Sequence, residues 1–233
     1  HRGQHNGDGE QDLRRGHQHW GSANATSQLH LLAAHHVAAM WRGAVDAEGL
    51  PHGRGTLTLG KRARFEGRMA HGSRDGVGCL IVDEGASDSE DGDDEPALST
   101  LRVRWRRDAP WGAGVFTEPD GATVHGVWED GELRGAAHER HADGSVRYVG
   151  AYGGGVRDGV GVEVRADGGA LAGTWRGGQL HGDRCAYLFP CADGGALVGE
   201  WRDGRMARAF YTTLAAAPAP SALPAVARPL PAE

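Results

Sequence analysis

The sequence predicts a mainly β protein, an antiparallel meander of hairpins that together form one elongated twisted sheet. Three observations support this. A short motif recurs about every 23 residues, each copy alternates apolar residues about a glycine, and turn dipeptides occur twice in each period. The 39 glycines among 233 residues are spread evenly, which disfavours helices because glycine is a poor helix former.

The recurring motif defines about seven units. Well-kept copies are "FEGRMAHGSRDG" (65–76), "VHGVWEDGELRG" (124–135), "YVGAYGGGVRDG" (148–159), "LAGTWRGGQLHG" (171–182) and "LVGEWRDGRMAR" (197–208). Degraded copies are "RGAVDAEGLPHG" (42–53) and "LRVRWRRDAPWG" (101–112). The position aligned with the first glycine of the motif falls at 44, 67, 103, 126, 150, 173 and 199, and in the two degraded copies it is occupied by Ala44 and Val103. Such a period indicates a repeat architecture.

Within a unit, an apolar residue lies two positions before the first glycine and an aromatic or methionine two positions after it. All three therefore share one face of a strand. We expect the glycine to leave room for a ring from the neighbouring strand, so that Gly173→Val overpacks beside Trp175. The repeat positions expected to carry the fold are Gly67, Gly126, Trp128, Gly150, Tyr152, Gly173, Trp175, Gly199 and Trp201.

Two sets of dipeptides predict the turns. The first contains Asp130-Gly131, Gly177-Gly178 and Asp203-Gly204, and the second contains Asp120-Gly121, Asp143-Gly144, Asp167-Gly168 and Asp193-Gly194. Two turns per period leave two short strands per period. The alternation of Val160, Val162 and Val164 with Gly161, Glu163 and Arg165 suits a sheet with one solvated face. Glu163 and Asp167 are interpreted as solvated-face or turn residues.

The composition divides the chain into regions. Residues 1–41 form a His-rich leader, predicted to be largely disordered, in which residues 27–41 are compatible with a short helix. Residues 42–213 form the repeat domain, with an acidic loop insertion at 83–95. The insertion has eight acidic residues in thirteen positions and accounts for most of the net charge of −6. Residues 214–233 are an Ala/Pro-rich linker, and the chain resembles a fragment of a longer protein.

No catalytic, cofactor-binding or metal-ligating residue is predicted in this chain. The GxGxxG, P-loop and GxSxG motifs are absent from the sequence. His17, His19, His35 and His36 lack metal-site spacing and nearby cysteines. Cys79, Cys185 and Cys191 form no CxxC pair, so reduced thiols are expected. The basic residues are spread through the units, and no direct nucleic-acid contact is predicted.

The units resemble MORN repeats, which form chains of β-hairpins. A further resemblance covers residues 43–214. The segments "GLPHG" (49–53), "FEG" with "HG" (65–72), "GVFTEPDG" (114–121), "WEDGELRG" (128–135), "DGGALAG" (167–173) and "GDRCAYLFP" (182–190) are similar in order to the N-terminal MORN half of SET-domain histone-lysine methyltransferases. In that family the MORN sheet precedes the catalytic domain and packs beside it.

This resemblance implies a parent enzyme that uses S-adenosylmethionine and acts on histone H3 or other proteins. Its expected location is the nucleus, at chromatin, with the cytoplasm as a second location. The SET signatures themselves are missing, so this chain is expected to flank the catalytic domain, with that domain as its partner. The alternative is a stand-alone MORN scaffold at membranes or in a cytoskeletal or ciliary assembly. The net charge of −6 makes membrane contact the weaker expectation.

Overall fold

The computed structural model describes residues 39–85, 96–190 and 194–213, and within them every regular element is a strand. The strands are β1 (Ala39–Val45), β2 (Pro51–Leu59), β3 (Ala63–Ala70), β4 (Ser73–Asp83), β5 (Leu98–Arg106), β6 (Ala109–Thr117), β7 (Thr123–Glu129), β8 (Glu132–Arg140), β9 (Val146–Gly153), β10 (Val156–Val164), β11 (Ala170–Arg176), β12 (Gln179–Leu180), β13 (Gly182–Leu188), β14 (Gly195–Arg202) and β15 (Arg205–Thr213).

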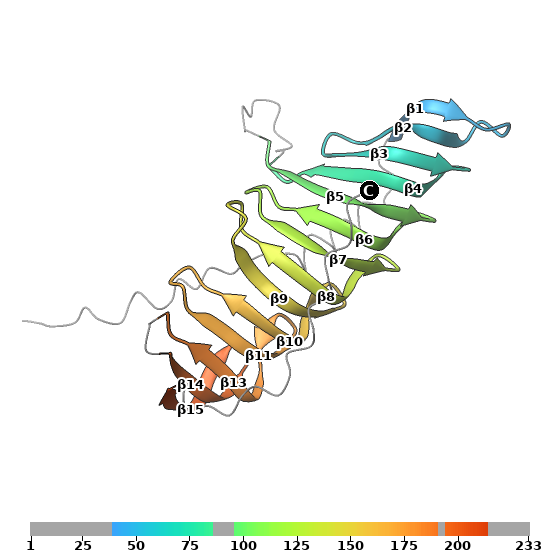
Figure 1. Ribbon diagram of the computed structural model, residues 1–233. Helices are drawn as coiled ribbons and strands as arrows, with labels where there is room; N and C mark the ends of the chain where they lie inside the picture. The colour runs from blue at the N-terminus through green and yellow to red at the C-terminus, as the bar shows by residue number, and fades with distance from the viewer. Residues whose placement is uncertain (1–38, 86–95, 191–193, 214–233) are drawn as a thin grey trace, which may run out of the picture.

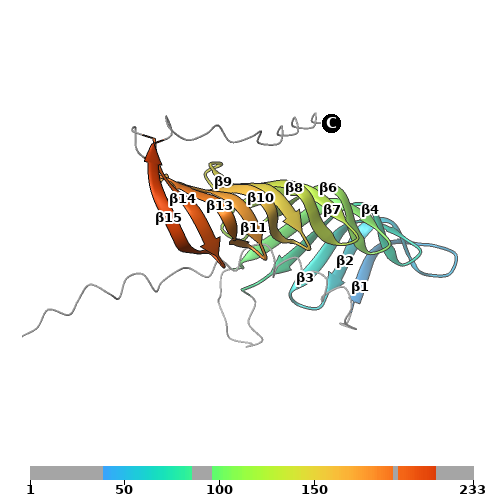
Figure 2. The ribbon, with the colours of Figure 1, turned by 90° about the horizontal axis from the view of Figure 1, so that it is seen from below.

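All strands belong to one antiparallel sheet in sequence order, with the two-residue β12 pairing only with β11. Figure 1 shows the hairpins following one another along a long, twisted ribbon, and Figure 2 shows the same ribbon from below. The predicted fold class is confirmed. No helix in the described ranges is long and apolar enough to cross a membrane.

The first unit begins earlier than the motif predicts. Strand β1 starts at Ala39, inside the region assigned to the leader, and pairs Trp41 with Leu57 and Gly43 with Gly55. The glycine of this unit is therefore Gly43, one residue before the predicted position. The rest of the predicted leader and helix, residues 1–38, lies outside the described residues, as do residues 86–95 of the acidic insertion and the linker at 214–233.

One buried face of the sheet, here called the inner face, carries the core. A row of directly paired residues crosses every long strand of this face. The row is Trp41, Leu57, Phe65, Leu80, Leu101, Phe116, Val124, Glu139, Tyr148, Glu163, Leu171, Tyr187, Leu197 and Tyr211. Burial of this mainly apolar row gives each hairpin its contact with the next.

The repeat glycines lie beside this row, and two of them, Gly67 and Gly150, are covered by an aromatic ring of their own strand, where the sequence predicts a ring from the neighbouring strand. Phe65 covers Gly67 of its own strand and Gly78 of the next, because a Cβ at Gly67 would lie 2.5 Å from Phe65 Cζ. Tyr148 covers Gly150 and Gly161 in the same way. Gly67 and Gly150 are therefore covered by the ring two residues earlier on their own strand, whereas Gly78 and Gly161 are covered by the same rings from the neighbouring strand.

Gly173 has a different neighbour from the one expected. A Cβ there would lie 2.6 Å from Cys185 Sγ and 3.0 Å from Cys185 Cα, so the predicted overpacking is against β13 and not against Trp175. The glycine also has a φ of +154°, at the edge of the range that side chains rarely adopt.

The turns follow the predicted dipeptides. Both central residues have positive φ at Asp130-Gly131, Gly177-Gly178 and Asp203-Gly204, as type I′ hairpins require. Neighbouring tight turns are also linked, since the second turn residue donates its N–H to a carbonyl of the preceding hairpin. These bonds, 2.9–3.2 Å long, are Gly72 to Pro51, Asp108 to Arg74, Gly131 to Pro110, Gly155 to Leu133, Gly178 to Arg157 and Gly204 to Leu180.

Candidate interaction surface

The predicted aromatic repeat positions lie in the core. Trp128, Tyr152, Trp175 and Trp201 are all buried on the inner face. The Trp175 indole donates its N–H to the carbonyl of Gly161 at 3.1 Å, so it reaches over the glycine of the adjacent strand. These positions stabilise the sheet and present nothing to a ligand.

A chain of alternating charges interrupts the apolar row at β8 to β10. Glu139 is 2% exposed and accepts hydrogen bonds from Arg147 Nε and Arg157 Nε, both at 2.7 Å. Arg147 also forms an ion pair with Glu118 at 2.5 Å, and Arg157 forms one with Glu163 at 2.8 Å.

Hydrogen bonding also sets the protonation state of this cluster. Burial alone would raise the pKa of Glu139, but the hydrogen bonds and positive charge of Arg157, together with the Tyr152 hydroxyl and Arg147, hold that pKa below its usual value. Glu139 is therefore an ionised, fully paired carboxylate. It is a structural ion-pair centre and not a poised general base.

The strand pairing also changes the interpretation of Glu163. It pairs directly with Tyr148 and Leu171, which places it on the inner face, whereas Val160 lies on the opposite face and is 53% exposed. The solvated-face interpretation of Glu163 is therefore wrong. Asp167 lies in a turn, as predicted, where it accepts the Gly169 N–H at 2.9 Å.

The opposite face, here called the outer face, is basic over β1 to β5. Its exposed arginines are Arg42, Arg54, Arg64, Arg68, Arg102, Arg104 and Arg106. Arg54 and Arg68 are direct cross-strand partners, an arrangement of like charges that is unfavourable unless an anion lies nearby. Glu66, an acid on the same face of β3, pairs with Arg64 at 2.8 Å. Residues that seem scattered in the sequence are thus gathered on one surface.

Over β9 to β15 the outer face carries an apolar row among charged residues such as Arg184 and Arg202. A paired row there consists of Val149, Val162, Ala172, Ala186, Val198 and Phe210. Phe210 is 64% exposed, and on the inner face of the same last strand Met206 and Tyr211 are also largely exposed. The described sheet therefore ends in an uncovered strand with exposed large side chains.

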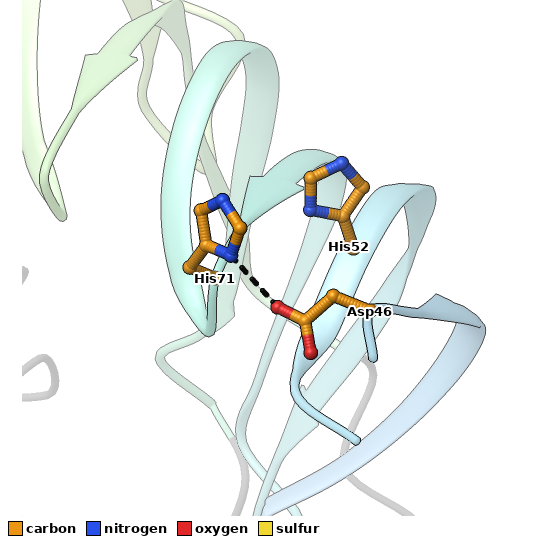
Figure 3. A group of neighbouring side chains, drawn as sticks. All are labelled: Asp46, His52 and His71. Carbon is orange, nitrogen blue, oxygen red and sulfur yellow. Dashed lines mark hydrogen bonds and ion pairs between the residues drawn. The ribbon is translucent and has the colours of Figure 1, made fainter. Parts of the chain in front are cut away.

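One cluster of potential metal ligands lies near the other end of the described sheet. Asp46 from the β1–β2 loop, His52 from β2 and His71 from the β3–β4 turn place one ligand atom each within 4.8 Å of one another (Figure 3). His17, His19, His35 and His36, the histidines weighed from the sequence, lie outside the described residues. Cys79 and Cys185 are free thiols, and Cys191 lies outside the described residues.

Comparison with known families supports the repeat assignment. The sequence model of the MORN repeat family matches residues 47–62, 104–123, 148–170 and 172–182. These matches support MORN repeats in the matched segments. The MORN matches fall on hairpins of the sheet and indicate a repeat-based interaction module. No curated protein matched the chain.

The sequence analysis missed the charge chain around Glu139 and the Asp46–His52–His71 cluster, for different reasons. A signal existed for Arg157 of the charge chain, because "RDGVG" occurs at 74–78 and again at 157–161. In both copies the arginine lies over an indole, with Arg74 Cζ 4.5 Å from the Trp105 ring and Arg157 Cζ 5.4 Å from the Trp175 ring. The Asp46–His52–His71 cluster has no such signal, since its members come from two different units.

Proposed function

We propose that this MORN sheet is the non-catalytic module of a SET-type protein-lysine methyltransferase, in which it flanks the catalytic domain and helps to present protein substrates. The observation that supports this most is the exposed apolar surface of β15, which no other described element covers. In the family that the chain resembles, the catalytic domain follows the repeats, so this is the end where it would pack.

The character of the surface fits a docking role. Repeat proteins normally close their ends with polar caps, and an exposed strand edge with large apolar side chains otherwise favours aggregation. Met206, Phe210 and Tyr211 are each more than half exposed on β15. A following domain that covers them would bury apolar area on both faces of the last strand.

Under this proposal S-adenosylmethionine binds to the catalytic domain, and the MORN module acts in the nucleus, at chromatin. A histone H3 tail is itself basic, so the arginines of β1 to β5 are not the surface that receives it. Substrate presentation would instead use the β9 to β15 half, next to the catalytic domain.

The first test is to extend the coding sequence beyond Glu233 and look for SET signatures. If they follow, hydrogen exchange of β15 in the longer polypeptide should be slower than in residues 1–233, and Phe210→Asp should abolish that difference. Val77→Asp is the matched control, because Val77 is equally exposed at 64% on the outer face but lies on β4. Equal β15 exchange in both polypeptides would refute the docking proposal, and a stop codon after Glu233 would refute the enzyme assignment.

The arginine surface favours a second candidate, a stand-alone MORN scaffold at an anionic membrane. Juxtaposed arginines attract acidic lipid headgroups by about 1 kcal/mol per basic residue near the surface. Co-sedimentation with phosphatidylserine vesicles should then occur at low salt and be reduced by Arg54→Gln with Arg68→Gln. Neutral vesicles are the control. If the protein sediments with neither the phosphatidylserine vesicles nor the neutral ones, this role is excluded.

A further inference from the structure

We infer that Asp46, His52 and His71 form a binding site for a divalent transition-metal ion of the zinc class, which would join the first two hairpins of the sheet. The donor set of two imidazoles and one carboxylate suits Zn²⁺ and similar ions. The three residues come from the β1–β2 loop, strand β2 and the β3–β4 turn, so an ion would link segments that are apart in sequence.

The carboxylate is already oriented. Asp46 Oδ1 accepts the backbone N–H of Leu50 at 2.8 Å and that of Glu48 at 3.1 Å. Its other oxygen, Oδ2, is left facing His71 Nδ1 at 2.9 Å. The Asp46 side chain is only 8% exposed. These turn hydrogen bonds hold the carboxylate in place, as a ligating carboxylate requires.

The second observation concerns His52. Its Nδ1 atom is buried and has no hydrogen-bond partner among the described residues. A buried ring nitrogen of this kind is costly unless something binds it. The His52 and His71 rings lie 5.2 Å apart, edge to face, and Figure 3 shows Asp46 beside them. An Asp46–His71 ion pair alone would leave His52 Nδ1 unsatisfied, whereas a shared ion would satisfy all three groups.

The geometry needs only small side-chain movements. Bonds of ~2.0–2.2 Å in a tetrahedral zinc site separate the ligand atoms by about 3.4 Å. The present ligand atoms lie within 4.8 Å of one another, and His71 is exposed and free of packing constraints on its outer side. The backbone of the turn is held in place, because Gly72 donates its N–H to Pro51, the residue before His52, at 3.0 Å. Three protein ligands would leave a further coordination position toward solvent.

The test is calorimetric titration of the full chain with ZnCl₂, together with melting curves. We expect one equivalent to bind with an affinity that falls by at least ~100-fold in Asp46→Asn, His52→Ala and His71→Asn, since even an outer hydrogen-bond partner of a metal site typically contributes 10–100-fold. His71→Asn is the safest variant, because its φ of +47° is a conformation that asparagine tolerates. Zn²⁺ should raise the melting temperature of the wild type and not that of His71→Asn.

Two controls separate this site from other histidines. His138→Ala removes a histidine that stacks on His125 at 4.7 Å on the outer face, and this variant should still bind one equivalent of Zn²⁺. Replacing His17, His19, His35 and His36 with alanine removes histidines of the N-terminal region and should also leave it intact. The inference is overturned if the three site variants bind Zn²⁺ as the wild type does, or if the N-terminal replacements alone abolish the equivalent.

Discussion

At the scale of single residues, the decisive feature is the pairing of a ring with two glycines. Tyr148 lies flat over Gly150 and Gly161, and its ring is held between Tyr152, at 5.8 Å, and Trp175, at 5.4 Å. The ring therefore cannot move aside for a new methyl group. Glycine is needed at these positions for space, whereas at the tight turns it is needed for its positive φ.

This predicts the effect of a one-carbon substitution. In Gly161→Ala the new Cβ would lie 2.5 Å from Tyr148 Cζ, and we expect a loss of ~1–3 kcal/mol in unfolding free energy through overpacking. Gly153→Ala is the control on the same hairpin, since its Cβ would lie 3.4 Å from the nearest atom, Asp158 Cβ. Urea denaturation measures both variants. Similar stabilities for the two would show that the ring does not confine Gly161.

At the scale of strands and turns, the sequence predicted the hairpins well because their signals are local. Asp130-Gly131 and Asp203-Gly204 announce type I′ turns by themselves, and the period-two alternation fixes the strands. The assignment of faces was less secure: Val160 looks like a core residue, but the core position two residues from Gly161 is taken by Glu163. Glu163 lies on the inner face at 23% exposure, and Arg157 from the same strand pairs with it at 2.8 Å.

The charge chain across β8, β9 and β10 predicts a pH dependence. The pKa of Glu139 is lower in the folded protein than in the unfolded chain, where it is about 4.3. The ionised Glu139 therefore stabilises the fold fully above pH about 4.3, and this stabilisation is lost as pH falls through the folded pKa. Glu139→Gln should be destabilised by ~3–5 kcal/mol at neutral pH, since it leaves Arg147 and Arg157 underpaired. The difference in unfolding free energy between the two proteins should narrow as pH falls below the unfolded value of about 4.3, because the unfolded wild type takes up a proton there while the folded Glu139 still stays ionised.

The control for this measurement is Glu132→Gln. Glu132 and Arg134 form an exposed pair at 2.8 Å, so the loss should stay below ~1 kcal/mol at every pH. Unfolding curves at several pH values give both comparisons. A Glu139→Gln variant whose deficit is the same at pH 3 and pH 7 would contradict ionic pairing as the cause.

At the scale of the whole molecule, the sheet is a linear array in which the substantial strand contacts join neighbours in sequence. Stability in such arrays is a sum of unit and nearest-neighbour terms. The seven-unit organisation was predictable from the 23-residue period. The arginine surface over β1 to β5, the apolar row over β9 to β15 and the Asp46–His52–His71 cluster were not. Each joins residues from several units that only the turn geometry and register bring together.

The linear architecture predicts graded protection from hydrogen exchange. Amides of the central strands, β5 to β11, should exchange slowest, and protection should fall toward β1 and β15, which have one paired neighbour each in the described sheet. Exchange followed by mass spectrometry resolves this gradient. Uniform protection along the chain would indicate one globally cooperative unit instead of an array of neighbouring repeats.

The MORN matches indicate a repeat-based interaction module, and our proposal places the binding of S-adenosylmethionine outside this sheet. Methyl transfer requires a cofactor pocket and a channel that orients the lysine amine away from water. In the described sheet the inner face is filled by its own side chains, and Glu139 is paired by two arginines. The most direct measurement is calorimetric titration of residues 1–233 with S-adenosylmethionine, for which we expect no heat of binding. Saturable binding in the micromolar range would contradict the account.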